Sequence, residues 1–325
     1  MNHRQVQHIS AIRIVTICAA LIAVTTTSTA EAADKTSGTS PSISTNQNDN
    51  TLSIELDGRP ALRYRFGDVK FKPCIDRWYT PGGTNILRDA PHDHLHHHAM
   101  MFAVAVDGVN FWEEKSPKSG KEVGQKPGKV VTKTNNGMTT AAFSQNLIWK
   151  DSDNKPLLNE QRTIELISAN GLDASLVNWT TTLSPPDGKK SAQLGGRHYY
   201  GLGMRFVESM DNVGKMIAAD GVKSRSVLGH AWFAPARWMA YTAPANGKTV
   251  TVAIFDHPQN PRYPGGVFHM TKPFAYLSAT IGLGDKPYEV KAGKSLSLRY
   301  GAALWDGKVG TEKIEAAYRI WSKIK

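Results

Sequence analysis

The sequence predicts an all-β fold: a large antiparallel β-sandwich, supersandwich-like, with one C-terminal amphipathic helix. Three observations predict it. Apolar and polar residues alternate in many short runs, turn-forming pairs such as Asp107-Gly108 and Asn246-Gly247 separate the runs, and no helical pattern of about 10–15 residues lies between them. Parallel βαβ units need such helices, so antiparallel sheets packed face to face are expected instead.

The first expected element is a hairpin. Apolar residues alternate with polar ones over residues 52–56 and again over 62–66, and Asp57-Gly58 between the two runs is typical of a tight turn. Further strands are expected at Ala99–Val106, Thr139–Trp149, Glu160–Ile167, Ala174–Leu183, Tyr200–Val207, Val250–Phe255, Phe274–Ala279 and Leu296–Leu304.

The last expected element is a helix over residues 311–323. Ile314, Ala317, Tyr318 and Trp321 recur at helical spacing, and lysine and glutamate occupy the opposite face. We expect this helix to pack on a sheet.

The N-terminus has the pattern of a secretory signal. Basic residues precede an apolar run over 14–23, and small residues then end in Ala30-Glu31-Ala32. We therefore expect a signal peptide over residues 1–32, a flexible polar tether over 33–50, and a single β-sandwich domain over 51–325. The protein is expected to be periplasmic or secreted, with no membrane span after the signal. Cys74 is the only cysteine beyond the signal, so no intrachain disulfide is expected.

The formal charge of the chain is +11. A basic exported protein could meet nucleic acid, an anionic surface or an acidic substrate. Basic runs interleaved with aromatic residues are missing from the sequence, so no nucleic-acid partner is expected. A basic surface that serves solubility and an acidic substrate both remain open.

A histidine cluster is the most informative feature for function. Five of the 11 histidines fall within residues 92–98, and imidazole is both the side chain that titrates near neutrality and the commonest metal ligand. If a strand begins near His94, then His94, His96 and His98 share one face of it, and His97 lies on the other. The cluster could serve metal-free acid–base chemistry or sugar binding, hold a metal, or form an exposed run.

For the metal alternative, His94 and His96 would be the first two ligands of a divalent ion whose identity stays open. No cofactor is certain from the sequence. A third ligand would have to come from a distant residue, and the candidates are His198, His230, His257, His269, Glu113 and Glu114.

A second group of polar residues lies on a proline-rich loop that follows the strand expected at 250–255. Prolines at positions 258, 261 and 264 stiffen a segment that carries Asp256, His257 and Arg262, with His269 just beyond it. Such side chains can hydrogen-bond hydroxyl groups or clamp a carboxylate. A purely structural loop is the alternative. Because neither the segment 256–269 nor residues 94–98 has an evident local partner, we expect both to line one concave site.

Several blocks of the chain resemble a secreted sandwich-type family filed as "methane oxygenase PmoA-like", which is treated as a domain of unknown function. The blocks are Ser53–Phe66, Lys72-Pro73, Asp93–His97, Gly108–Glu113, Tyr200–Phe206, Asp256–Arg262 and Gly293–Gly307. The family usually continues the histidine motif with Arg-Gly and a Trp, where this chain has His98, Ala99 and Met101. The resemblance implies a relative of the galactose-mutarotase-type sandwich and a link to carbohydrate.

Residues and resemblance together predict a secreted carbohydrate-active protein that acts on a saccharide or sugar acid by proton transfer, through mutarotation, elimination, dehydration or hydrolysis. Such an enzyme would be a lyase, hydrolase or epimerase. A metal-dependent oxidoreductase or hydrolase and a noncatalytic glycan-binding module are the alternatives. The candidate catalytic residues are His94, His97, Glu113, Asp256 and His257, and the candidate substrate-binding residues are Trp112, His198, Trp232, Arg262 and His269.

Overall fold

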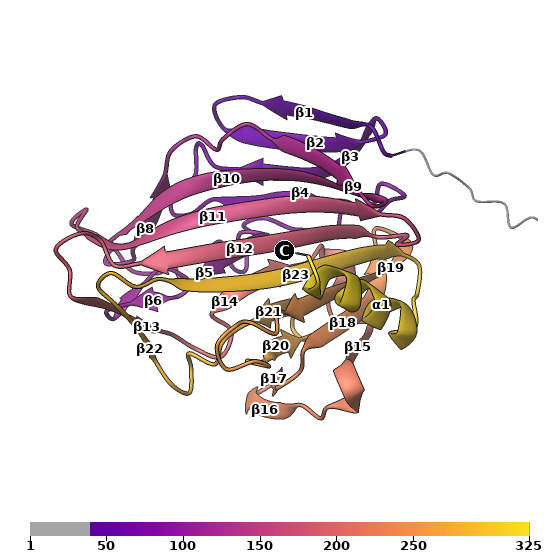
Figure 1. Ribbon diagram of the computed structural model, residues 1–325. Coiled ribbons are helices and arrows are strands. Elements are labelled where there is room, and N and C mark those ends of the chain that lie inside the picture. Colours follow the sequence, from indigo (N-terminus) through magenta and orange to yellow (C-terminus); the bar gives the residue numbers. More distant parts are fainter. Residues whose placement is uncertain (1–39, 325) are drawn as a thin grey trace, which may run out of the picture. The chain divides into compact units, whose positions relative to one another are not determined.

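The computed structural model describes residues 40–324 of the chain, and these form the predicted antiparallel sandwich (Figure 1). The expected signal peptide at 1–32 and the first part of the expected tether lie outside the described residues. Every strand pairing in the described part is antiparallel. Within residues 40–324, no helix is long and apolar enough to cross a membrane.

The first sheet has ten strands. In spatial order these are β1 (Ile43–Gln47), β2 (Thr51–Leu56), β3 (Arg59–Arg65), β4 (Cys74–Trp78), β5 (Met100–Ala103), β14 (Gly201–Arg205), β21 (Tyr276–Ala279), β20 (Val267–Met270), β17 (Ala231–Ala234) and β16 (Arg225–Leu228).

The second sheet has nine strands and carries the longest ones. In order they are β15 (Lys215–Ala218), β18 (Trp238–Ala245), β19 (Lys248–Asp256), β23 (Leu296–Asp306), β12 (Ser175–Ser184), β11 (Pro156–Ala169), β10 (Met138–Lys150) and β8 (Lys121–Gly124), with β9 (Val131–Asn135) also paired to β10. A four-stranded sheet consists of β22 (Tyr288–Lys291), β13 (Ser191–Gly195), β6 (Ala105–Val106) and β7 (Val109–Asn110).

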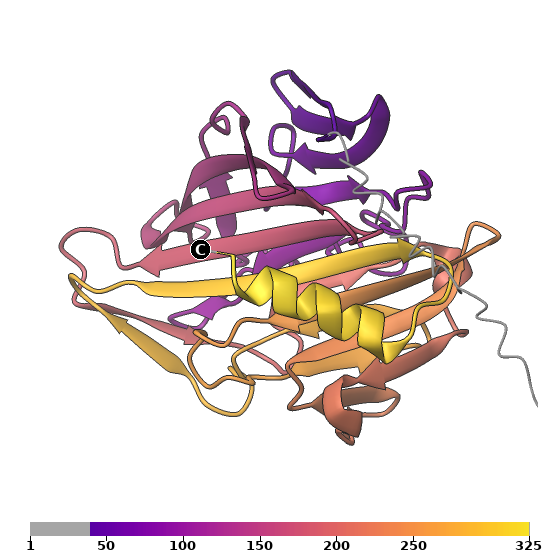
Figure 2. The same ribbon diagram turned by 45° about the vertical axis from the view of Figure 1, so that its right-hand side comes forward.

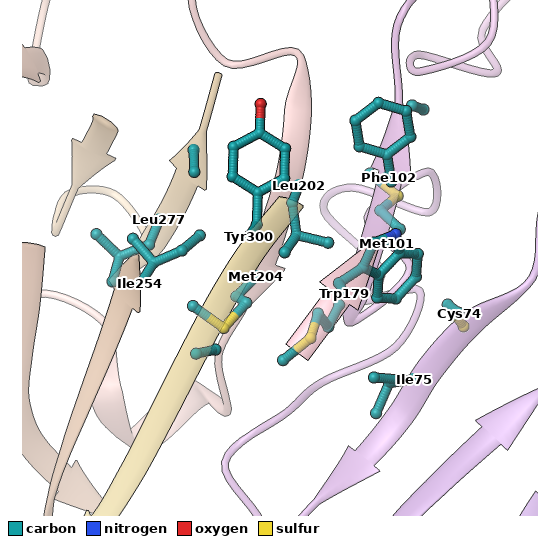
Figure 3. Close-up of a cluster of buried hydrophobic side chains, with 14 of the residues drawn as sticks. Cys74, Ile75, Met101, Phe102, Trp179, Leu202, Met204, Ile254, Leu277 and Tyr300 are labelled. Atoms are coloured by element: carbon teal, nitrogen blue, oxygen red, sulfur yellow. The ribbon is translucent and has the colours of Figure 1, made fainter. Parts of the chain in front are cut away.

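The main core lies between the two large sheets. Figure 3 shows Ile75, Leu202 and Leu277 of the ten-stranded sheet together with Trp179 and Tyr300 of the nine-stranded sheet. All five side chains are buried, because strand residues of period two send alternate side chains inward. Cys74 belongs to the same cluster and is a free, buried thiol. Burial raises the pKa of this thiol well above its ordinary value.

A charge cluster is buried within this core. The guanidinium of Arg162 donates to Glu160 Oε1 at 2.9 Å and to Glu122 Oε2 at 2.8 Å, and all three side chains are at most 1% exposed. One positive charge therefore faces two carboxylates. Burial, together with the neighbouring charge of Glu160, outweighs the attraction of Arg162 and raises the pKa of Glu122 to about 8.

The predicted C-terminal helix is α1 (Thr311–Ser322). It lies along β23 in Figure 2, on the face of the nine-stranded sheet away from the main core. Ile314, Ala317, Tyr318 and Trp321 are the buried residues of the helix, as their spacing predicts. Short 3₁₀ turns occur at Glu208–Met210 and Ala219–Gly221.

One expected irregular segment turns out to be regular. The tether was expected to extend to residue 50, but residues 43–47 form β1, which pairs in register with β2. The side chain of Asn48 accepts hydrogen bonds from the backbone N–H groups of Asn50 and Thr51, which fixes the turn between the two strands. A polar strand at the sheet edge needs only backbone pairing, so composition alone did not reveal it.

Candidate functional site

A pocket opens on the face of the ten-stranded sheet that points away from the nine-stranded sheet. On β20, Phe268 and Met270 lie opposite Ser278 and Tyr276 of β21, while His269 between them lies opposite Leu277. Leu277 faces the nine-stranded sheet (Figure 3), so Phe268, Met270 and Tyr276 project from the other face of their strands, where Phe268 and Tyr276 are still buried members of the same hydrophobic cluster.

The cavity measures about 340 Å³. Five aromatic rings, four imidazoles, two ammonium groups and one carboxylate contribute to its lining. The residues are His94, His96, His97, Trp112, Glu113, Lys115, Tyr199, Leu228, His230, Ala231, Phe268, Met270, Lys272, Pro273, Phe274 and Tyr276. An apolar cavity with a few polar groups is the usual form of a small-ligand site.

The histidine cluster forms one wall of the pocket, but on a loop rather than on a strand. The strand expected to begin near His94 begins only at Met100. Two successive turns precede it, because the N–H of His94 donates to Pro91 O and the N–H of His97 donates to His94 O, each at 2.9 Å. The turns stack the rings of His94 and His97 with centroids 4.6 Å apart, and they bring His96 to 4.7 Å from His97.

His94 is oriented by a carboxylate behind it. Its Nδ1 lies 3.0 Å from Asp93 Oδ2, and the same oxygen accepts a hydrogen bond from Arg205 Nη2 at 3.0 Å. Burial opposes ionisation of Asp93, but the hydrogen bond from His94 and the charge of Arg205 outweigh it and lower the pKa of Asp93. An ionised carboxylate only accepts, so His94 Nδ1 carries a proton and Nε2 remains for a ligand.

His96 and His97 stay neutral near pH 7. Burial, with a smaller effect of the Lys115 charge, lowers the pKa of His96 to about 4. Burial and the adjoining imidazole of His96 lower the pKa of His97 far below its ordinary value. Neither ring is therefore a ready proton donor as an imidazolium, although each still offers one donor and one acceptor nitrogen.

Three buried polar atoms of the pocket lining make no hydrogen bond of good geometry among the described residues, although Trp112 Nε1 lies close enough to the Tyr276 hydroxyl to act on it as a weak donor. The three atoms are His97 Nδ1, Trp112 Nε1 and the hydroxyl of Tyr276. The ring of His97 lies 5.2 Å from that of Trp112 and 5.3 Å from that of Tyr276, so the three side chains adjoin one another. Burying polar groups without partners costs about 1–3 kcal/mol each, which is unusual in a folded protein.

Glu113 supplies the carboxylate of the pocket. Its Oε1 accepts a hydrogen bond from the hydroxyl of Tyr199 at 2.5 Å, and its Oε2 accepts one from Asn110 Nδ2 at 3.2 Å. Arg197 Nε lies 3.6 Å from Oε1. Glu113 follows the end of β7 by three residues, and its N–H donates to Asn110 Oδ1, which holds this turn of the chain at the pocket.

The side chains of His98 and Glu114, which adjoin His97 and Glu113 in the sequence, do not line the cavity. His98 binds Asp89 through Nδ1 at 2.9 Å and Glu114 through Nε2 at 3.1 Å, and Lys72 binds the other oxygen of Glu114. Burial lowers the pKa of His98, but these two carboxylates outweigh it, so the pKa is raised. This chain of buried ion pairs anchors the histidine loop behind the pocket wall.

Of the segment 256–269, Phe268 lines the pocket together with the histidine loop, but the expectation of a single site was wrong for Asp256, His257 and Arg262. Asp256 is fully buried and accepts hydrogen bonds from Asn260 Nδ2 at 2.7 Å and from the N–H of Gly265 at 2.9 Å. His257 packs edge-on against Trp321 of α1, with ring centroids 5.2 Å apart. The guanidinium of Arg262 donates to backbone carbonyls at positions 281, 286 and 287. All three side chains hold loops and α1 in place.

The other expected substrate-binding residues also lie outside the lining. His269 and Trp232 are directly opposite each other on β20 and β17, on the reverse face of the strands that carry Phe268. His269 Nε2 is bonded to the hydroxyl of Ser224 at 2.8 Å. His198 lies beside Asp285, with Nδ1 at 3.8 Å from a carboxylate oxygen. Trp112, by contrast, is in the pocket wall as expected.

Sequence reasoning missed several residues in or beside this site, among them Asp93, Tyr199, Arg205, Phe274 and Tyr276. Asp93 and Arg205 stand in sequence blocks that the family resemblance includes, and this was the one available signal for them. The aromatic residues have the pattern of ordinary core residues. The ring of Phe274 separates the cavity from Arg205, whose guanidinium carbon is 3.8 Å from the ring centroid.

The structure offers a possible metal ion two neighbouring imidazoles, but no third ligand beside them in the described residues. The rings of His94 and His96 have centroids 5.5 Å apart. Within residues 40–324, no group of three histidine, cysteine, aspartate or glutamate side chains is arranged to hold a metal ion. The assignment of His94 and His96 as ligands stays a prediction.

Comparisons with known proteins give one family and a set of distant structures. A family model described as "Family of unknown function (DUF6807)" matches residues 51–319, and that description does not include the methane oxygenase name. A search of curated proteins finds no match.

Two solved structures similar to this chain are galactosidases. The galactosidase domain of an alpha-galactosidase-sucrose kinase has a TM-score of 0.47 at 8% identity, and the match covers 82% of this chain and 42% of that one. A GH36 alpha-galactosidase from Geobacillus stearothermophilus in complex with stachyose has a TM-score of 0.41 at 12% identity, over 84% of this chain and 41% of that one. The chain thus spans about two fifths of the length of these galactosidases.

Proposed function

We propose that this chain, which belongs to the DUF6807 family of unknown function, binds a saccharide or sugar acid in the pocket lined by the histidine loop and acts on it by acid–base chemistry. The observation that carries the proposal is the group of three buried polar atoms that make no hydrogen bond of good geometry among the described residues, on His97, Trp112 and Tyr276. A ligand that offers hydroxyl groups to these atoms would remove the cost of leaving them unpaired.

The aromatic lining supports a sugar as that ligand. A pyranose has apolar C–H faces and a rim of hydroxyl groups, and the pocket combines the rings of Tyr199, Phe268 and Phe274 with the polar atoms of its histidines and Glu113. Aromatic rings pack well against such faces, while tyrosine and tryptophan add a polar group at one end.

His94 is the acid–base residue in this proposal. With its Nδ1 proton directed to Asp93, the free Nε2 can take a proton from a ligand hydroxyl or carbon and return it later. Arg205 fixes Asp93 from behind. A carboxylate that orients the imidazole and stabilises its protonated form is the arrangement used by many acid–base histidines.

Glu113 is the second proton-transfer group, and its hydrogen bonds to Tyr199 and Asn110 hold it in the lining. His97, kept neutral by burial, orients the ligand rather than carrying a charge. Mutarotation, elimination, dehydration and hydrolysis all need a proton removed at one position and supplied at another, and His94 and Glu113 provide two such groups. We also propose export to the periplasm or the cell exterior, on the strength of the signal-like N-terminus.

The test is a binding and turnover screen of the purified chain against neutral and acidic saccharides, with calorimetry for binding and NMR for products. Binding that is lost when Trp112 is replaced by alanine, with turnover lost in Glu113→Gln, supports the proposal. Failure of every saccharide to bind overturns it. Binding without any turnover would identify a glycan-binding module instead, and activity that follows bound metal would favour the metal alternative.

A further inference from the structure

The rim of the pocket carries two positive charges that the proposed chemistry does not use. Lys115 and Lys272 both line the cavity and both are exposed. The lysine ion pairs of the described residues involve other lysines, at positions 72, 126, 189 and 313, so neither rim ammonium group has a carboxylate partner within residues 40–324. They reach the rim from separate loops, one after β7 and the other after β20.

The nearby carboxylates do not neutralise this charge. Glu113, the sole carboxylate of the lining, already accepts hydrogen bonds from Tyr199 and Asn110 and lies 3.6 Å from the guanidinium of Arg197. Two further carboxylates stand behind the wall, each paired with its own cation. Asp93 binds Arg205, and Glu114 binds Lys72 and His98. The cavity therefore presents an excess of positive charge to a ligand.

We infer that the ligand is a uronate-containing saccharide whose carboxylate lies between Lys115 and Lys272. The inference rests on the proposed function and names its substrate class. A lysine ammonium binds a carboxylate as a point charge with three rotatable donors, so it needs no fixed bidentate geometry. A neutral saccharide would leave both ammonium groups without a partner, and a negative ligand would be drawn toward the opening of the pocket.

The plain alternative is that both lysines belong to an ordinary basic surface, as on any chain with a formal charge of +11. Lys118 provides a matched control for this reading. It is exposed, lies three residues from Lys115, and does not line the cavity. Substitution by glutamine removes the positive charge of the lysine and keeps a polar side chain with a similar aliphatic part. Exposed positions tolerate such a substitution without loss of the fold.

The experiment measures binding of uronate oligosaccharides by calorimetry, each beside its carboxyl-reduced neutral form and beside a sulfated oligosaccharide of the same length. We expect at least one uronate to bind about tenfold or more tightly than its reduced form, because a charge-assisted contact is worth about that factor. In Lys115→Gln with Lys272→Gln this preference and the salt dependence of binding should disappear, while affinity for the reduced form changes little. Lys118→Gln should behave as the unchanged protein.

Equal affinity for the uronate and its reduced form would overturn the inference and leave the proposed function intact. Tighter binding of the sulfated oligosaccharide would overturn the assignment of a carboxylate. An unchanged preference in the double variant, with an unchanged melting temperature, would overturn the role of the two lysines. If no saccharide binds at all, the proposed function fails as well, so the two failures are distinguishable.

Discussion

Gly203 of β14 leaves the space that the hydroxyl of Tyr276 occupies. A Cβ at position 203 would lie 1.7 Å from that oxygen, far inside van der Waals contact. The tyrosine therefore reaches across the neighbouring strand to the rings of His97 and Trp112, and only glycine at position 203 permits it. The absence of a side chain at Gly203 therefore determines where Tyr276 lies in the pocket lining.

Gly203→Ala is expected to displace Tyr276 and abolish saccharide binding, with a loss of about 1–3 kcal/mol in the free energy of unfolding. Calorimetric binding and urea unfolding measure the two effects. Gly195→Ala is the matched control, because a Cβ on this strand glycine would meet nothing within 4 Å. Normal binding by Gly203→Ala would show that the position of Tyr276 does not matter to the ligand.

Asp93→Asn is expected to reduce turnover by about 100-fold while the ligand still binds, because an amide can donate to His94 Nδ1 as well as accept from it and so no longer selects the tautomer that leaves Nε2 free. Asp107→Asn serves as control. Both aspartate side chains are 33% exposed, but Asp107 binds Lys189 away from the pocket. Equal rates for the two variants would refute the role of Asp93.

Glu113→Gln should keep the hydrogen bond from the Tyr199 hydroxyl, because the amide oxygen still accepts, yet remove a proton-transfer group. We expect kcat to fall by about 100-fold or more with KM nearly unchanged. Steady-state kinetics on whichever saccharide is turned over gives both constants. Glu208→Gln, at a carboxylate that is 76% exposed and outside the cavity, should leave them unaltered.

The Glu122 carboxyl predicts a pH dependence of stability. Its pKa is raised from 4.5 to about 8 in the folded chain, so the folded state holds a proton that the unfolded state has lost. Stability should therefore fall as pH rises from about 4.5 to about 8, and Glu122→Gln should abolish this part of the slope. Urea unfolding at about pH 5, 7 and 9 measures it.

Glu160→Gln is the contrasting variant for that measurement. Glu160 accepts hydrogen bonds from Arg162, Trp149 and Thr181, so its replacement should destabilise the chain over the whole pH range. If Glu122→Gln changes stability by the same amount at each pH, the raised pKa of Glu122 is not a property of the folded protein.

The strands that the sequence predicts over their greatest length are those that alternate over a long run. β10, β11, β12 and β23 each have one face toward the core, so the period of two is visible in their residues. β4, with the sequence Cys-Ile-Asp-Arg-Trp, was missed although β14, whose five residues are all buried, was predicted. Two of the five residues of β4 are charged, and its aspartate is buried because it pairs with Arg63, which the sequence does not reveal.

The candidate site was predictable where chemistry was concentrated locally. His94, His97, Trp112 and Glu113 do share one cavity, although their roles stay proposals. The prediction for the proline-rich loop failed at Asp256. An aspartate on a stiff loop is typical of a site residue, but its partners are a backbone N–H and an asparagine that only the folded loop brings near it. Polar residues that stabilise a loop and polar residues that bind a ligand look alike in sequence.

Cys74 gives the folded chain a reporter of its own opening. It is the sole cysteine from residue 40 onward, and its side chain is fully buried on β4, near Arg65 and Asp89. A thiol reagent can modify it only after β4 has separated from its neighbours, since a buried protonated sulfur is unreactive. The labelling rate in native buffer therefore measures how often the structure around β4 opens, without any engineered probe.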